Sequence, residues 1–277
     1  MYKFPSYCGI VIATSLRLWG QGSDPGESSR GFTWYERFDG SVNTLGTITR
    51  LDSTAGYNFN SHFSIEGGVP VYFVFPSAST TATTGTRSFQ GIGNAYGRLG
   101  LALDNPVVNF ESTLTVSAPT GDQTVGLSTG NVTVDWSNYF DHDIAKLTPF
   151  AEIGLANAVS DTAIFIRPYA TYGTVLHWEA GARYKVAKTL SISGSVYGVE
   201  PWGKQTLVNR LSALFGPQRS TGSDLTQDHG FSGWAEIRPK AHLEFHAGYT
   251  HSTKYALDTF FFGTGVSLGK VLRHLGI

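Results

Sequence analysis

Apolar and polar residues alternate with a period of two along most of the chain. In residues 175–186, VLHWEAGARYKV, one parity carries His177, Glu179, Arg183 and Lys185, and the other carries leucine, tryptophan, alanine and tyrosine. Successive side chains of a β-strand point to opposite faces of a sheet. This segment is therefore predicted to be a strand with one charged face and one apolar face.

The same alternation recurs in about twelve segments, each of the length that a tilted membrane-spanning strand requires. An even number of strands suits closure into an antiparallel barrel. The expected strands are residues 31–42, 44–58, 62–75, 89–103, 107–117, 131–142, 147–156, 174–186, 190–199, 230–238, 242–252 and 256–268.

The links between these strands alternate in length. Outer-membrane barrels have short periplasmic turns at one end and longer extracellular loops at the other. A soluble sandwich with Greek-key crossovers has no reason to show this alternation. The short links are residues 58–61, 104–106, 143–146, 187–189 and 239–241, and the long ones are 76–88, 118–130, 157–173 and 200–229, with shorter members of the long set after the first and eleventh strands.

Parity also separates an expected exterior from an expected lumen. Apolar residues such as Phe63, Leu99, Leu114, Trp136 and Phe260 share the parity that would face lipid, where a charge is costly. Closure is expected because hydrocarbon offers no partner to an open sheet edge. The opposite parity, expected to line the lumen, carries Arg50, Asp52, Glu66, Arg98, Glu111, Asp135, Glu152, His177, Glu179, Arg183, Lys185, Glu236, Arg238, His242, Glu244 and His246.

Two of the expected strands fit this division poorly. In the first, Glu36 shares the parity of Phe32, Trp34 and Phe38, which requires a bulge, a change of register or a position at the rim. The second, residues 44–58, is only weakly apolar on both faces.

Composition and charge exclude several other classes of protein. The 277 residues include 33 glycines, 13% aromatic residues and only 15% charged residues, which favours a sheet-rich fold over a helical bundle. A net charge of -1 without a basic patch argues against binding to nucleic acid. The single cysteine, Cys8, excludes an intramolecular disulfide. No run of 18 apolar residues occurs, so any crossing of a membrane has to use strands.

The two ends of the chain differ from the middle. Lys3 and the apolar run that follows resemble a secretory signal, interrupted by Arg17, and a polar linker follows. We therefore expect residues 1–29 to be a leader and linker, residues 30–269 to form the barrel, and residues 270–277 to be a tail.

Several motifs resemble those of one family of outer-membrane transporters, the meta-pathway phenol degradation proteins. They are GIGNAYGR at residues 91–98, PTGD at 119–122, GLSTG at 126–130 and TPF at 148–150, and the similarity in pattern covers roughly residues 31–269. The resemblance implies a twelve-stranded barrel that passes small solutes, aromatic or apolar compounds among them, and it implies no catalytic residue. The chain departs from the family at residues 270–277, KVLRHLGI, where the barrel-assembly machinery usually reads a terminal aromatic residue. Either a tail follows the last strand or the assembly signal is atypical.

The number of strands limits the width of the interior. Side chains fill a barrel of about eight strands and about sixteen leave an open channel, so about twelve predict a narrow or partly blocked pore. Most of the lumen charges are expected to pair across neighbouring strands. Glu179, Arg183, Glu236, Arg238 and Glu244 are expected to form a mixed-charge constriction.

The longest link, residues 200–229, contains an apolar pattern of its own. Leu207, Leu211, Leu214 and Phe215 recur at helical spacing and predict a short helix. This helix would fold over the mouth of the barrel as a gate, pack on its rim, or contact a partner.

These patterns together predict a passive channel for small solutes in the bacterial outer membrane, surrounded by lipid and inserted by the barrel-assembly machinery. We expect no enzymatic activity and no cofactor. The HLEFH segment puts His242, Glu244 and His246 on one face, but no further ligand is set by the sequence, so no metal site is expected. The alternative is a plugged structural or adhesive barrel whose long loops bind a ligand outside the cell. The oligomeric state is left open.

Overall fold

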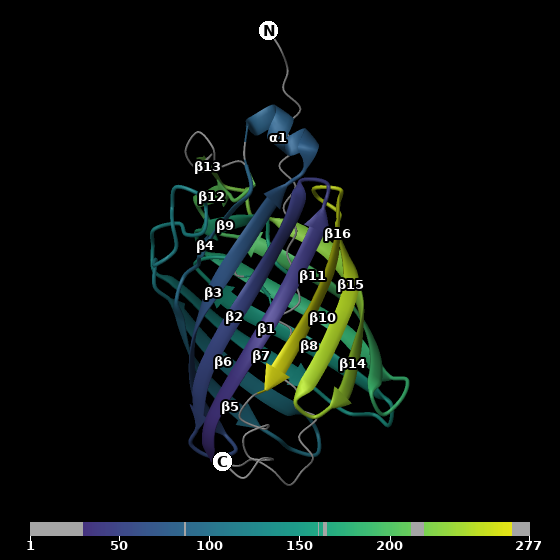
Figure 1. The fold of residues 1–277 in the computed structure, drawn as a ribbon. Helices are drawn as coiled ribbons and strands as arrows, with labels where there is room; N and C mark the ends of the chain where they lie inside the picture. Colours follow the sequence, from purple (N-terminus) through teal and green to yellow (C-terminus); the bar gives the residue numbers. More distant parts are fainter. Residues whose placement is uncertain (1–29, 86, 160, 163–164, 212–218, 268–277) are drawn as a thin grey trace.

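The chain forms a closed antiparallel β-barrel in the computed structural model, which describes residues 30–85, 87–159, 161–162, 165–211 and 219–267 (Figure 1). The wall strands pair in an unbroken ring, in which β2 pairs with β3 and β1 pairs with β16. Closure gives the backbone groups of the first and last strands partners that lipid could not supply. The closed twelve-stranded barrel predicted from the alternation is confirmed.

The wall is a 13-stranded sheet with twelve strand positions, because β4 and β5 pair with successive parts of β3 and act as one interrupted strand. The wall strands are β1 (Gly31–Asn43), β2 (Gly46–Asn58), β3 (Phe63–Pro76), β4 (Phe89–Ile92), β5 (Tyr96–Leu103), β6 (Asn109–Ser117), β7 (Thr133–Asp141), β8 (Leu147–Ala156), β10 (Val175–Lys185), β11 (Leu190–Pro201), β14 (Asp228–Lys240), β15 (Leu243–Ser252) and β16 (Leu257–Ser267).

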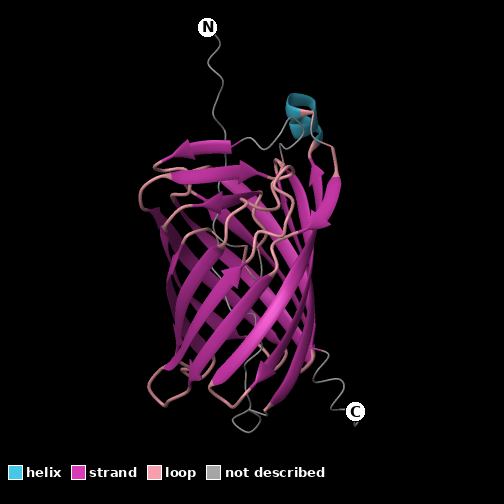
Figure 2. Ribbon diagram, turned by 90° about the vertical axis from the view of Figure 1, so that its left-hand side faces the viewer, coloured by secondary structure: helices cyan, strands magenta, loops and turns pink. Residues whose placement is uncertain are grey.

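The two ends of the barrel differ as the link lengths predict. One end carries only short turns, and the other carries the long loops together with the helix α1 (Ala78–Thr84). At the long-loop end, β9 (Tyr169–Tyr172), β12 (Gln205–Asn209) and β13 (Arg219–Gly222) form a second, three-stranded sheet. Figure 2 shows these short strands lying across the upper end of the barrel.

In the described part of the chain, no helix has both the length and the apolar character needed to cross a membrane.

The outer face of the barrel is apolar. Leu114 on β6 is 37% exposed and lies beside Leu99 and Trp136 on the neighbouring strands. Ile153 on β8 and Phe260 on β16 are also exposed on this face. Apolar exposure on this scale marks a surface that meets lipid or a partner, and here it surrounds a closed barrel.

The first strand keeps its register in spite of Glu36. β1 pairs with β2 from Gly31 to Asn43 without a shift, so no bulge turns Glu36 inward. Its carboxylate instead accepts hydrogen bonds of 2.7 Å from the Trp34 indole and from the Ser53 hydroxyl on the outer face. Glu36 pairs with Val266 of β16 and with Ser53 of β2, so it lies within the paired wall with its side chain on the outer face.

Candidate functional site

The inner face of β1, β2 and β15 carries a network of buried charges. Arg37 Nη2 lies 2.8 Å from Glu244 Oε1, and Arg50 Nη2 lies 2.8 Å from Asp39 Oδ2. His246 faces the same interior, with Nε2 3.5 Å from Asp39 Oδ1. Pairing of this kind offsets the cost of removing each charge from water.

Arg238 and Glu236 on β14 extend this network toward the short-turn end. Arg238 Nε pairs with Glu236 and lies 3.5 Å from Oε2 of Glu244. The Arg238 side chain is 27% exposed, whereas that of Glu244 is 7% exposed. The network therefore becomes more accessible to water as it approaches the short turns.

A second group of charges, on β7, β8 and β10, is dominated by acids. His177 Nε2 lies 3.1 Å from Asp135 Oδ1, and His177 Nδ1 lies 3.7 Å from Glu152 Oε1. Glu179 is directly opposite Glu152 in the register of β8 and β10, and both are buried. The three carboxylates thus share one side of the interior with a single histidine.

The other expected lumen residues on β2, β3, β5 and β6 also lie on the inner face. Arg98 Nη1 lies 3.5 Å from Glu66 Oε2, and the Tyr96 hydroxyl donates to Asp52 at 3.1 Å. Glu111 is buried and accepts a hydrogen bond of 3.1 Å from the hydroxyl of Thr113.

Three expected lumen residues lie nearer the short-turn rim. Arg183 is half-buried near the end of β10. Lys185 is exposed and lies 3.3 Å from Asp143 in the turn before β8. His242 lies in the turn before β15. Of the three polar residues of the HLEFH segment, only Glu244 and His246 therefore lie in a wall strand. The part that all these charges play in solute passage stays a prediction.

Four inward-facing aromatic side chains, Tyr139, Phe150, Trp234 and Phe261, form what we call the aromatic row. They come from β7, β8, β14 and β16 and belong to one buried cluster. The ring centroids of Tyr139 and Phe150 are 6.0 Å apart, and those of Phe150 and Trp234 are 6.3 Å apart. The interior is therefore crossed by an apolar surface as well as by charges.

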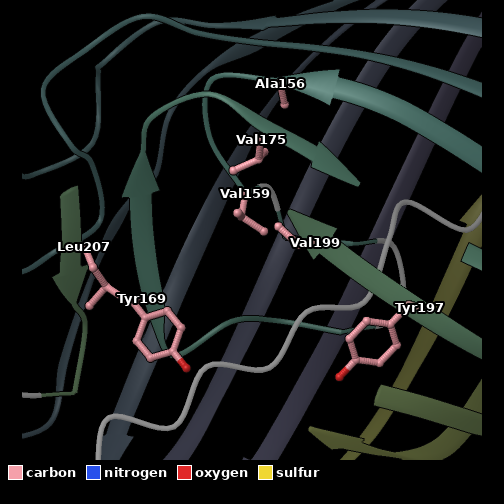
Figure 3. Close-up of a cluster of buried hydrophobic side chains, with 7 residues drawn as sticks. All are labelled: Ala156, Val159, Tyr169, Val175, Tyr197, Val199 and Leu207. Carbon is pink, nitrogen blue, oxygen red and sulfur yellow. The ribbon is translucent and has the colours of Figure 1, made fainter. Parts of the chain in front are cut away.

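The long-loop end of the interior is packed with side chains from the loops. Tyr169 on β9 and Leu207 on β12 are each 1% exposed and pack, with Val159, against inward-facing residues of the wall. The small sheet is thus held inside the mouth by an apolar cluster and not only by its backbone pairing. Figure 3 shows this cluster, which consists of Ala156, Val159, Tyr169, Val175, Tyr197, Val199 and Leu207.

The segment before β9 reaches further into the barrel. Phe165 and Ile166 are fully buried, and Phe165 joins the cluster that contains the aromatic row. The Ile166 amide donates a 2.8 Å hydrogen bond to the hydroxyl of Ser41 on β1, on another part of the wall. Ile166 also packs with Leu127, which comes from a different long loop.

A buried ion pair fixes this segment to the wall. Asp161 accepts two hydrogen bonds from Arg210 Nη1, at 2.9 and 3.0 Å, and one of 2.5 Å from the hydroxyl of Tyr72 on β3. Arg210 lies over the Tyr72 ring, 4.7 Å from its centroid, and donates to the carbonyl of Arg167 at 2.9 Å. One contact therefore joins the wall to two long loops.

The electrostatics of this ion pair predict that acid will loosen the mouth. Burial alone would raise the pKa of Asp161, but the charges of Arg210 and Arg50 and the Tyr72 hydrogen bond outweigh it and lower the pKa. A lowered pKa means that the stabilisation is present at neutral pH and is lost as the pH falls through a value below the usual 3.8. Conductance in planar bilayers should therefore rise in this acid range.

The Asp161→Ala variant separates this effect from the titration of other carboxylates. Its conductance should lack the part of the acid response that depends on Asp161. Identical pH profiles for the variant and the unmodified protein would contradict this assignment.

The short helix predicted around Leu207 is wrong where the structure describes it. Leu207 lies in β12, and Leu211 follows in a turn, each buried in the mouth. The apolar spacing that resembled a helix arises because Leu207 packs in one cluster and Leu211 in another. Leu214 and Phe215 lie outside the described residues.

Sequence reasoning missed several residues of this interior. Arg37 and Asp39 have the parity opposite to Phe38. Because Phe38 belongs to the apolar outer face of the first strand, this parity could have placed both charged residues in the interior. Phe150 and Trp234 share the parity of Glu152 and Glu236, which placed them inside. Asp161 and Arg210 lie in loops, where no periodicity could indicate that they meet.

No family model matches the chain, and no curated protein matches it in sequence. Among solved structures, the COG4313 outer membrane channel from Pseudomonas putida F1 has a TM-score of 0.54 at 12% identity, covering 88% of this chain and 99% of that one. The KdgM porin has a TM-score of 0.51 at 8% identity, with coverages of 84% and 98%. The NanC porin has a TM-score of 0.50 at 7% identity, also with coverages of 84% and 98%.

These similarities show that the chain has the fold of bacterial outer-membrane channels and porins, in agreement with the predicted location. At such low identity they bear on the fold alone. Membership of the phenol degradation family stays a prediction from the motifs.

Proposed function

We propose that the protein is a passive outer-membrane channel for small solutes, with a narrow interior lined by both acids and bases. The observation that supports this proposal is the network on the inner face, where Arg98 and Arg238 keep partly exposed side chains inside a closed barrel. A barrel with only a structural role gains nothing from burying ion pairs, because apolar side chains of similar volume would stabilise it as well or better.

The packed mouth favours a second candidate, a plugged structural or adhesive barrel. Phe165, Ile166, Leu207 and Leu211 fill the long-loop end of the interior, and such packing obstructs passage unless the loops move. For the channel, the loops are a gate that opens.

Swelling of liposomes that contain the purified protein separates the two candidates. A channel admits small neutral solutes such as arabinose, so the liposomes swell faster than protein-free ones. A permanently plugged barrel leaves the rate unchanged, even after the Asp161–Arg210 contact is removed by substitution. That second result would reject the channel.

Neutralising single charges near the short-turn end is expected to change ion preference in opposite directions. A unit charge about 8 Å from a passing ion in water interacts with it by about 0.5 kcal/mol, which corresponds to a roughly twofold change in relative permeability. Glu236→Gln should therefore lower the cation preference, and Arg183→Gln should raise it, each by about twofold in reversal-potential measurements in planar bilayers.

Lys188→Gln provides a control, because Lys188 is exposed in the turn between β10 and β11. It should leave the ion preference close to that of the unmodified protein. Equal permeability ratios for all three variants would contradict a lumen controlled by these charges.

A further inference from the structure

We propose that the aromatic row binds a single neutral sugar ring, and that Phe165 occupies this place in the structure described here. The inference rests on the proposed channel and names the class of solute that it would select. Three features of the interior support this inference. They are flat apolar surfaces, buried polar atoms without hydrogen-bond partners, and a loop side chain that lies where the sugar ring would bind.

The aromatic row offers flat surfaces because the strands beneath it carry small residues. A Cβ at Gly181 would lie 2.6 Å from the ring of Phe150, and one at Gly248 would lie 2.5 Å from the ring of Phe261. The rings thus lie close against the wall, in the space that larger residues would take. Aromatic faces of this kind pack against the apolar C–H face of a sugar ring.

Polar groups around the row lack hydrogen-bond partners among the described residues. They are the indole N–H of Trp234, the hydroxyls of Ser193 and Thr259, and Nδ1 of His246. Ser193 is opposite Trp234 in the register of β11 and β14, and the His246 ring lies 6.4 Å from that of Phe261. All are buried.

The mixture of unpaired groups indicates the chemistry of the ligand. An indole N–H needs an acceptor, whereas hydroxyls and imidazole nitrogens both donate and accept. A buried polar group without a partner is costly, so a ligand that supplies partners is favoured over an apolar one of the same shape. Sugar hydroxyls donate and accept, and the charges of Arg37 and Glu244 on the same side as His246 pair with each other.

Phe165 stands in for such a ring. Its benzyl group is about as wide as a six-membered sugar ring, and it is fully buried in the cluster of the aromatic row. Two hydrogen bonds hold it there: the Phe165 amide donates to the Thr162 hydroxyl at 2.9 Å, and Arg50 donates to the Thr162 carbonyl at 2.8 Å. A sugar that enters the row has to displace Phe165, so binding would be coupled to movement of the loop.

The test is saturation-transfer NMR of methyl α-D-glucopyranoside with the detergent-solubilised full chain, because this sugar does not partition into micelles. If the state with Phe165 displaced is populated at roughly 10% or less, Phe165→Ala should strengthen binding about tenfold or more. In that background, Trp234→Leu should abolish most of the gain. Phe231→Ala is the matched control, because Phe231 lies on the same strand but is exposed on the outer face.

Three outcomes would overturn the inference. They are no saturable sugar signal with Phe165→Ala, an affinity unaffected by Phe165→Ala, or saturable binding of phenol but not of the sugar, measured against empty micelles. Heat-modifiability on gels shows whether each variant is folded. Sugar binding without liposome swelling would reject the proposed channel, and swelling without sugar binding would reject only this inference.

Discussion

Replacing Asp161 by alanine is expected to open the long-loop end of the barrel. The substitution leaves Arg210 buried without its carboxylate and removes the acceptor of the Tyr72 hydroxyl. Breaking a buried ion pair in this way costs about 3–5 kcal/mol. If the substitution destabilises the closed arrangement of the loops by this amount relative to the open one, the ratio of open to closed states rises roughly a hundredfold or more. Single-channel recordings should show this as a large increase in open probability.

Two further variants make this result specific. Asp161→Asn keeps the shape and part of the hydrogen bonding, so its effect should be smaller than that of alanine. Asp122→Ala removes a loop carboxylate that accepts hydrogen bonds from the nearby amide and hydroxyl of Thr124, and should leave the recordings unchanged. Equal open probabilities for Asp161→Ala and the unmodified protein would show that the Asp161–Arg210 contact does not hold the mouth closed.

The second large effect is expected on the outer face. Leu114→Arg places a charge on the apolar band near the middle of β6 and should lower the free energy of unfolding from lipid vesicles by about 2–4 kcal/mol. The adjacent Thr113→Arg points its side chain inward, where Glu111 offers an opposite charge. Its cost should stay within about 1 kcal/mol.

The difference between these neighbouring substitutions measures the environment of each face of the strand. Both introduce the same side chain into the same strand, so changes in strand propensity nearly cancel. Denaturant titrations followed by tryptophan fluorescence give the two values. Equal losses of stability would mean that the outer face does not meet lipid.

The wall of the barrel was predictable from the sequence because, within each strand, the alternation of apolar and polar residues indicates which side chains face outward and which face inward. The two-residue alternation placed Glu111 inward and Leu114 outward before any pairing was known, and the lengths of the links identified the two ends. The first strand was ambiguous because Glu36 lies on the outer face. Its partners, Trp34 and Ser53, come from its own strand and from the next one, and neither is visible from parity.

The contents of the mouth were not predictable in the same way. Leu207 and Leu211 suggested a helix because their spacing fits one, but each is buried against different parts of the wall. Phe165 and Asp161 carry no periodic signal at all. Their positions depend on Tyr72, Arg210 and the aromatic row, which are far from them along the chain.

By itself, the sequence determined the class of fold, the faces of most strands and the two unlike ends, because local alternation and turn residues act within a few positions of each other. Only the tertiary structure decided which charges pair across the interior and how the loops close it. Those contacts join residues that curvature and closure of the barrel bring together, and their energies depend on burial that arises only once the wall is complete.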